Sequence, residues 1–264
     1  MKINLDLHTH TVFSHGKGTI EENAISAKEK GLYGIVITDH GFSHPAFGMR
    51  RKKVPLMREL CKNAEDKHGV KVYLGIESNI RGRNGKIDVT PEDYSSLDVV
   101  LAGVHKFVFY NGLKDFNNLL VKNMLHDSFR IKPSDKLVKY NTECYINAVK
   151  TNPVDVLTHV GYGCICNAVE VAKACADYGT YIEISTKKSH LSDEEWEKVI
   201  ETGVNFVVNS DAHSVDRIGD TLLFEELSSR VKFPTERIMN IDGKIPTLRF
   251  SEYKKRHGIP TRLD

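Results

Sequence analysis

Seven short apolar runs in this chain end at or beside a histidine, aspartate or glutamate. They are INLDLHTH (3–10), GIVITDH (34–40), VYLGIES (72–78), VVLAGVH (99–105), VDVLTHV (154–160), TYIEIS (180–185) and NFVVNSDAH (205–213). One such ending could be accidental, but seven in the same position indicate a site built from equivalent ends of consecutive strands. Imidazoles and carboxylates bind divalent metals, so the pattern predicts a metal-dependent hydrolase.

Two of these endings place a pair of metal-binding side chains on one face of a strand. His8 and His10 are two residues apart, as are Asp211 and His213, and alternate residues of a strand share a face. Each pair alone is a weak signal, because many surface pairs have this spacing. Glu77 adds a carboxylate whose two oxygens could bridge two metals. The complete set is therefore far more specific than any of its parts.

Helical patterns alternate with the apolar runs. They begin at capping boxes, Thr19 with Glu22 and Ser192 with Glu195, and several close on a glycine. Strands that alternate with helices predict parallel β/α units. Seven units predict a distorted, TIM-like (β/α)7 barrel, with one domain over residues 1–264 and its chemistry at the carboxyl ends of the strands.

Composition excludes several other classes of protein. The net charge of +2 argues against a broad nucleic-acid binder, and no apolar stretch reaches the roughly 20 residues that cross a bilayer. The five cysteines are odd in number and lack the spacing of a disulfide scaffold, which indicates a cytoplasmic protein. The compact pair Cys164 and Cys166 is interpreted as two small buried thiols.

A family resemblance rests on motifs spread along the chain, DLHTHTVFSHGKGT, ITDHG, GIESNI, GVHK, THVG and NSDAH. In this order they resemble the PHP (polymerase and histidinol phosphatase) family, and in particular its small YcdX-type branch. The similarity extends over nearly the whole chain, to FPTERIMN near the end. Residues 107 to 152 depart from the pattern because this stretch is longer than expected. Such an excursion often forms a substrate lid or an oligomer contact.

The resemblance implies a PHP fold that holds three divalent metals, zinc foremost and otherwise manganese or iron. It implies three sets of ligands: His8, His10, Glu77 and Asp211 for the first metal; His15, His40 and His213 for the second; Glu77, His105 and His159 for the third. Relatives often have an aspartate in the region of His15, so this position departs from the pattern of the family. Asp6 and Asp39 are expected to accept hydrogen bonds from ligating imidazoles, and Asp6 to lie below His8 on the same face. Glu183 is expected to pack or hydrogen-bond below the cluster.

The charges of this ligand set favour an anionic substrate. Three divalent ions bring six positive charges, and Glu77 and Asp211 return two negative ones. Phosphate oxygens can span such ions, and coordination lowers the pKa of water towards ~7. We therefore expect in-line hydrolysis of a phosphate monoester by a hydroxide that bridges metals. The partner would be a small phosphorylated metabolite, such as histidinol phosphate, a mononucleotide or a sugar phosphate.

Several cations near the strand ends could contact the substrate. The candidates are Arg50, Arg51, Lys106, Lys187 and Arg217, although each could equally be a solvated surface residue. Five other histidines are expected to lie on the surface, although His44, shortly after TDHG, could instead line the rim of the site: His44, His68, His126, His190 and His257.

The sequence is also compatible with two other functions. A phosphodiesterase or exonuclease would need a basic groove and stacking aromatics, for which RRKK (50–53), Phe107, Phe109 and Tyr110 are candidates. A non-catalytic, metal-stabilised module would retain the ligands without activity. The sequence also permits a homo-oligomer.

Overall fold

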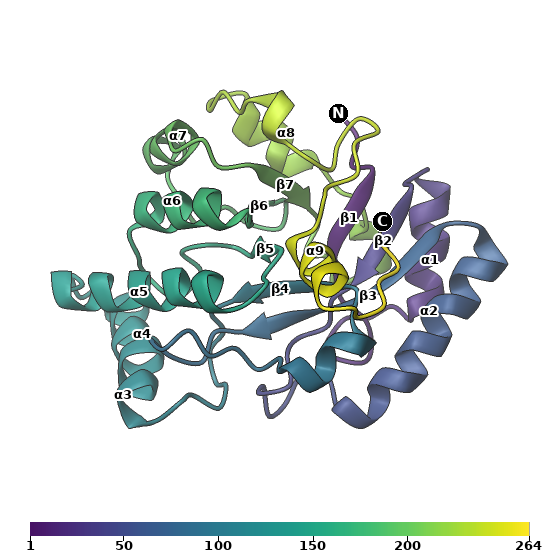
Figure 1. Cartoon of the computed structure of the whole chain (residues 1–264). Coiled ribbons are helices and arrows are strands. Elements are labelled where there is room, and N and C mark those ends of the chain that lie inside the picture. The colour runs from purple at the N-terminus through teal and green to yellow at the C-terminus, as the bar shows by residue number, and fades with distance from the viewer. Residues whose placement is uncertain (264) are drawn as a thin grey trace.

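The computed structural model describes residues 1–263, and its centre is a parallel sheet of seven strands that curves into a nearly closed barrel (Figure 1). The strands pair in the order of the sequence, β1-β2-β3-β4-β5-β6-β7. They are β1 (Leu5–Thr9), β2 (Gly34–Ile37), β3 (Lys71–Asn79), β4 (Val99–Gly103), β5 (Val156–Leu157), β6 (Tyr181–Ser185) and β7 (Phe206–Asn209). The predicted fold class, a distorted TIM-like (β/α)7 barrel, is thus confirmed.

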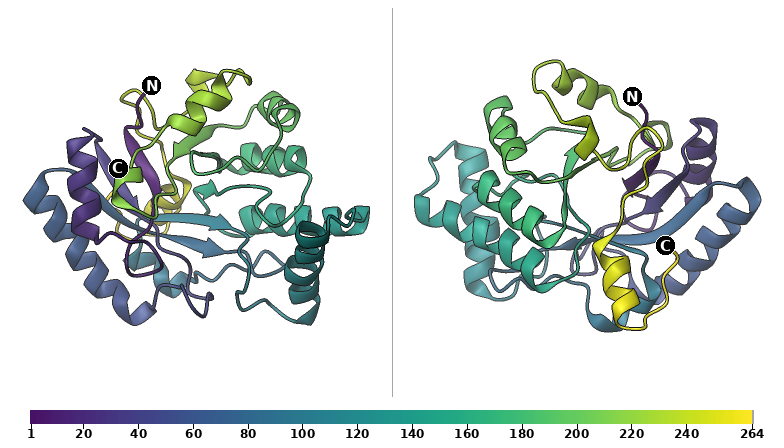
Figure 2. Two further views of the ribbon diagram at one scale, coloured as in Figure 1. Left: turned by 180° about the vertical axis from the view of Figure 1, so that it is seen from behind. Right: turned by 45° about the horizontal axis from the view of Figure 1, so that its top comes forward.

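Helices cover the outer surface of the strands, as both views of Figure 2 show. The helices between successive strands are α1 (Ile20–Glu29), α2 (Val54–His68), α3 (Leu113–Asp115), α4 (Asn123–Phe129), α5 (Asp135–Thr151), α6 (Ala168–Tyr178) and α7 (Asp193–Glu201). Those after β7 are α8 (Leu222–Ser228) and α9 (Arg249–Arg256). The short 3-10 segments are η1 (Arg51–Lys53), η2 (Pro91–Ser96), η4 (Val215–Arg217) and η5 (Thr235–Arg237). Both predicted capping boxes are present, at Thr19 and Ser192.

The apolar core has two layers because the strands are buried on both faces. One layer lies between the strands and the helices and includes Ile35, Val72 and Val171. The other fills the barrel interior and includes Leu5, Leu7 and Val207. This interior layer supports the polar side chains that follow it along the strands.

Side chains help to close the seam between β7 and β1. The Asn240 amide donates to the carbonyls of Leu5 and Val208 at 2.9 and 2.7 Å, and its oxygen accepts from the Val208 N–H. Asn209 Oδ1 accepts from the Leu7 N–H at 3.2 Å. One parallel bridge, between Thr9 and Ala212, lies above them. These bonds fix β1 and β7 against each other, so the residues that follow both strands occupy defined positions.

The excursion between β4 and β5 contains more than the barrel helix α5. Before α5 the chain forms α3, the π-helical segment η3 (Phe116–Lys122) and α4, which lie together beside the barrel in Figure 1. Lys106, just after β4, pairs with Asp127 of α4 at 2.9 Å. The excursion is therefore fixed at one point to the carboxyl end of the barrel.

Helix α9 lies across the central opening of the barrel in Figure 1. The buried Lys254 ammonium donates to the Leu97 carbonyl at 2.8 Å, and Asp155 accepts from the Phe250 N–H at 2.7 Å. Leu97 and Asp155 precede β4 and β5, so α9 covers the amino ends of the strands. The opposite end stays open for a site.

Within residues 1–263, no helix has both the length and the apolar character that crossing a membrane requires.

Candidate metal centre at the carboxyl ends of the strands

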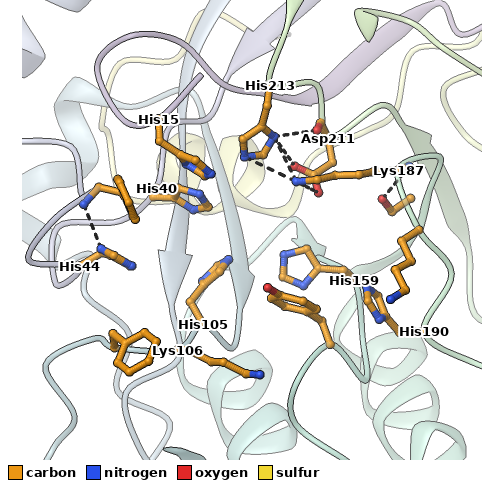
Figure 3. A pocket seen from close by; sticks show the side chains of 15 residues that line it. His15, His40, His44, His105, Lys106, His159, Lys187, His190, Asp211 and His213 are labelled. Atoms are coloured by element: carbon orange, nitrogen blue, oxygen red, sulfur yellow. Dashed lines mark hydrogen bonds and ion pairs between the residues drawn. The ribbon is translucent and has the colours of Figure 1, made fainter. Parts of the chain in front are cut away.

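A cavity of about 420 Å³ opens at the carboxyl ends of the strands (Figure 3). Six of the nine predicted ligands line it: His15, His40, His105, His159, Asp211 and His213. The other three, His8, His10 and Glu77, are fully buried beneath its floor. All nine predicted ligands are therefore brought to one place, from loops and strand ends more than 200 residues apart.

The first predicted ligand set converges closely. The Nε2 atoms of His8 and His10 lie 3.0 Å apart. Asp211 Oδ1 is 3.7 Å from the first nitrogen and 3.3 Å from the second, and Glu77 Oε1 is 3.3 Å from His8 Nε2. His8, His10 and Asp211 form one of three groups whose ligand atoms could hold a metal ion.

The second predicted set is close, with one difference in membership. His40 and His213 form a potential metal-binding group with His10, where His15 was expected. The His15 ring lies beside both, with centroids 4.8 Å from His40 and 4.3 Å from His213. The assignment of His15 to an ion stays a prediction.

Glu77 lies at the centre of the third set. Its Oε1 is 3.1 Å from His105 Nε2 and 2.7 Å from His159 Nε2, while its Oε2 is 2.8 Å from His40 Nδ1. Since Oε1 also approaches His8, this carboxylate contacts residues of all three predicted sets. The geometry suits a bridging ligand.

Burial and neighbouring charge set the protonation of these groups in opposite directions. Burial lowers the pKa of His8, but the carboxylates of Glu183 and Glu77 outweigh it and raise this pKa well above its ordinary value. At His10 burial and the nearby His40 together lower the pKa well below that value. For Glu77, burial favours the neutral acid, yet the surrounding histidines hold its pKa well below the usual range. The cluster therefore retains its carboxylates ionised.

Buried polar atoms that lack hydrogen-bond partners indicate whether these residues could bind metal ions. His10 Nδ1, His105 Nδ1 and His159 Nδ1 are buried without a hydrogen-bond partner among the described residues. His40 Nδ1 and Glu77 Oε2 lie 2.8 Å apart but are not aligned as a hydrogen bond. Buried polar groups are nearly always paired, so the unpaired His40 Nδ1 and Glu77 Oε2, which face each other within the cluster, fit a cation between them. The donor set of imidazoles and carboxylates suits zinc, manganese or iron.

The expected roles of Asp6 and Asp39 as partners of imidazoles were wrong. Asp39 accepts from the N–H and hydroxyl of Thr11 at 2.8 and 2.6 Å, and thereby holds the loop that follows β1. Asp6 accepts from the N–H groups of Ser210 and Gly219 at 3.1 and 2.9 Å. Simple strand alternation would place Asp6 below His8, but the register of β1 shifts between Asp6 and Thr9. Both carboxylates therefore position backbone segments rather than rings.

Glu183 forms the bond that was expected of Asp6. Its Oε1 lies 2.7 Å from His8 Nδ1, below the cluster, which confirms the expectation of packing or hydrogen bonding at that position. Strand alternation could have signalled this contact, because Glu183 shares its face of β6 with Tyr181 of the barrel interior.

Of the five cations predicted to meet substrate, Lys106 and Lys187 line the cavity. The three arginines do not, and we therefore remove them from this set. Arg51 pairs with Asp93 at 2.9 Å, Arg217 pairs with Asp220 at 2.7 Å, and Arg50 donates to the Pro45 carbonyl at 2.7 Å. Such local partners satisfy the guanidinium groups away from the cavity.

The prediction of surface positions was wrong for His44 and His190, which both line the cavity. Burial, reinforced by His40, lowers the pKa of His44 to about 4, and burial with His159 does the same for His190. Tyr162 packs beside both His159 and His190, with ring centroids 5.2 and 5.0 Å away. Cys164 and Cys166 are free and buried, as expected.

Comparisons with known proteins agree with this site. The PHP domain family matches residues 6–187, which include seven of the nine predicted ligands. A relative from Shewanella sp. (strain MR-4), named "Probable phosphatase", is 31% identical over 91% of this chain and 88% of its own length. A second of that name, from Thermoanaerobacter sp. (strain X514), is 33% identical over 93% and 94%.

A solved structure shares the fold at lower sequence identity. The histidinol phosphate phosphatase of Lactococcus lactis, solved with zinc, L-histidinol and phosphate, has a TM-score of 0.58 and 17% identity, over 92% of this chain and 99% of that protein. The family match covers more than half of the chain, and curated relatives extend it over nearly the whole length. This chain therefore belongs to the PHP domain family and is a hydrolase.

Proposed function

We propose that this protein is a metal-dependent phosphatase that hydrolyses a small phosphate monoester at a centre for three divalent ions. The observation that carries the proposal is the convergence of nine candidate ligands on one cavity that three lysines, Lys106, Lys187 and Lys188, also line. Zinc is the first candidate, with manganese and iron as alternatives.

The proposed ligand sets follow the distances in the cluster. His8, His10, Glu77 and Asp211 would hold one ion, whereas His105 and His159 would hold another together with Glu77. His40 and His213 would hold the remaining ion, with His15 beside them. Glu77 would contribute to more than one ion because its two oxygens face different histidines.

Bound divalent ions polarise phosphate oxygens and lower the pKa of coordinated water towards ~7, which supplies a nucleophile for in-line attack near neutral pH. The chain itself attracts and orients the phosphate. The Lys187 ammonium lies 3.2 Å from Asp211 Oδ2, beside the proposed ligands, and Lys106 lies near the rim of the same cavity. Ammonium groups at these places would donate charge-assisted hydrogen bonds to phosphate oxygens.

The remainder of the cavity would receive the alcohol part of the substrate. A volume of about 420 Å³ is in the range of small-molecule sites. His44 and His190, whose pKa values are about 4, would be neutral near pH 7 and offer hydrogen bonds without adding charge. A small phosphorylated metabolite such as histidinol phosphate, a mononucleotide or a sugar phosphate suits these dimensions.

A phosphodiesterase that acts on nucleotides or oligonucleotide ends is the second candidate. Phe107, just after β4, is 57% exposed at the cavity mouth and has a left-handed backbone with φ of 60°. An exposed ring in a strained conformation beside a site suits stacking on a base. The arginines of RRKK lie away from the cavity, which weighs against a phosphodiesterase. The lysines that line the cavity weigh against a non-catalytic module, because such a module binds no substrate.

The test compares p-nitrophenyl phosphate with bis-p-nitrophenyl phosphate after elemental analysis of the purified protein. We expect nearly three metal ions per chain and preferential hydrolysis of the monoester. Preference for the diester would favour the nuclease. Full metal occupancy without either activity would overturn both enzymatic proposals in favour of a structural module.

A further inference from the structure

Glu183 is a buried carboxylate that the proposed ligand sets do not include. It lies on β6, is 2% exposed, and contacts residues of β1, of β7 and of the segment that follows β5. Its Oε1 is 2.7 Å from His8 Nδ1 and accepts from Asn209 Nδ2 at 3.0 Å, while its Oε2 accepts from the backbone N–H of His159 at 2.9 Å. One side chain thereby connects the strand ends that carry His8 and His159.

The contact with His8 determines which nitrogen of the His8 ring is available to bind a metal. An ionised carboxylate only accepts hydrogen bonds, so the proton of this contact is on His8 Nδ1. In the neutral ring that metal binding requires, His8 Nε2 then keeps its lone pair, and it lies 3.0 Å from His10 Nε2 and 3.3 Å from Glu77 Oε1. A fixed tautomer and ring orientation are what outer carboxylates give to a ligating imidazole.

The contact with His159 acts through the backbone. His159 has φ of 30°, a left-handed conformation that non-glycine residues seldom adopt. The bond from its N–H to Glu183 Oε2 stabilises this conformation. In it, the imidazole Nε2 lies 2.7 Å from Glu77 Oε1. Glu183 therefore supports the direction of a second candidate ligand without contacting its ring.

We propose that Glu183 is a positioning residue that assembles two metal ligands, His8 through its ring and His159 through its backbone. This inference rests on the metal binding within the proposed function, and it is independent of which ester is hydrolysed. Without Glu183, His8 could rotate or change tautomer, and His159 could relax to an ordinary backbone conformation.

The variant Glu183→Gln separates these roles from simple packing, since glutamine has nearly the same shape. Its single amide oxygen can face either His8 and Asn209 or the His159 N–H, and its NH2 group then opposes a donor on the other side. The matched control is Asp155→Asn, a buried carboxylate that accepts two backbone N–H groups, from Val100 and Phe250, at the opposite end of the barrel.

The primary readout is zinc affinity, measured by competition with a fluorescent chelator. We expect Glu183→Gln to bind its weakest zinc ion about 10–100-fold less tightly than the wild type, as for other outer-shell partners. The control should bind zinc as the wild type does. Equal zinc affinity of Glu183→Gln and the wild type would overturn the proposal. Wild-type protein that binds zinc but lacks phosphatase activity would refute the proposed function and leave this comparison intact.

A second measurement, on the wild-type protein, tests the proposed tautomer of His8 even if Glu183→Gln does not fold. In zinc-loaded wild-type protein with ¹⁵N-labelled histidine, two-dimensional NMR distinguishes a protonated ring nitrogen from one bound to metal. We expect the His8 resonances, assigned with a His8→Gln variant, to show a proton on Nδ1 and metal on Nε2. Metal on Nδ1, or a proton on Nε2, would contradict the proposal.

Discussion

The two ends of the barrel use buried polar groups in different ways. At the carboxyl end, Glu77, His105 and His159 leave buried polar atoms without hydrogen bonds among the described residues. At the amino end, Asp155 accepts from the N–H groups of Val100 and Phe250 at 2.9 and 2.7 Å. Paired polar groups stabilise a fold, whereas unpaired ones cost stability unless a ligand occupies them.

The backbone shows the same contrast. Three residues that follow strands at the carboxyl end have left-handed backbones: Phe107, His159 and Asp211, with φ of 60°, 30° and 47°. At the amino end, Asp98 accepts from the Leu74 N–H at 3.0 Å and pairs with Arg58, so its charge is compensated. Strain and crowding are therefore concentrated where we place the chemistry. A single barrel separates stability from function by assigning them to opposite ends.

The variant Glu77→Gln should have the largest effect at the carboxyl end of the barrel. We expect the variant to lose more than about 100-fold in kcat/KM on p-nitrophenyl phosphate, because a direct ligand should matter more than an outer-shell partner. The metal-free variant should also unfold at a lower temperature than metal-free wild type, because the histidines that hold the Glu77 pKa well below its usual range lose their carboxylate partner. Steady-state kinetics and thermal unfolding with a chelator measure the two effects. A variant with full activity would place Glu77 outside the site.

At the amino end, the substitution Asp98→Ala should reduce stability and leave activity unchanged. It leaves the Leu74 N–H and the Arg58 guanidinium without their carboxylate, so we expect a loss of about 2–4 kcal/mol in the free energy of unfolding. Urea denaturation measures this loss. The activity per folded molecule should equal that of the wild type. A fall in kcat without a loss of stability would show that the two ends are not separate.

At the amino end, the buried Asp155 should make the stability of the fold depend on pH. Burial raises the pKa of Asp155 to about 7 in the folded protein, against an ordinary 3.8, although two backbone N–H groups oppose the shift. Between these values the folded state holds a proton that the unfolded state has lost, so stability should fall as the pH rises from 4 to 7. The slope from this one group is at most about 1.4 kcal/mol per pH unit. Urea denaturation of Asp155→Asn over this range should show a smaller slope, and an unchanged slope would contradict the assignment.

The smallest expected effect concerns the cavity rim. Lys187→Ala should raise KM for p-nitrophenyl phosphate about 10-fold, equivalent to one charge-assisted hydrogen bond, and change kcat less. The control Lys173→Ala removes an exposed lysine of α6 and should leave KM unchanged. Equal KM values for both variants would remove Lys187 from the substrate site.

Local signals in the sequence predicted much of this arrangement. The capping boxes at Thr19 and Ser192 fixed two helix starts, because Glu22 and Glu195 lie three residues further on in each case. Strand periodicity predicted that the endings with His10 or Asp211 would meet, since parallel strands present their carboxyl ends at one edge. These features depend on neighbours within a few residues or on the regular geometry of strands.

The missed features depend on long-range partners. Arg51 pairs with Asp93 and not with substrate, and nothing near Arg51 in sequence indicates this. His44 and His190 reach the cavity because their loops fold inwards, which spacing does not reveal. His159, whose backbone is left-handed, donates its N–H to Glu183, 24 residues away. The register of β1 shifts between Asp6 and Thr9, which strand alternation alone does not predict.

The most direct test of the central claim is a zinc titration of metal-free protein, followed by p-nitrophenyl phosphate hydrolysis. The three ligand sets predict no activity without metal, and a rise that reaches a plateau near three zinc ions per chain. Full activity in metal-free protein would contradict the metal-dependent mechanism. A plateau at one ion per chain would contradict the trinuclear centre.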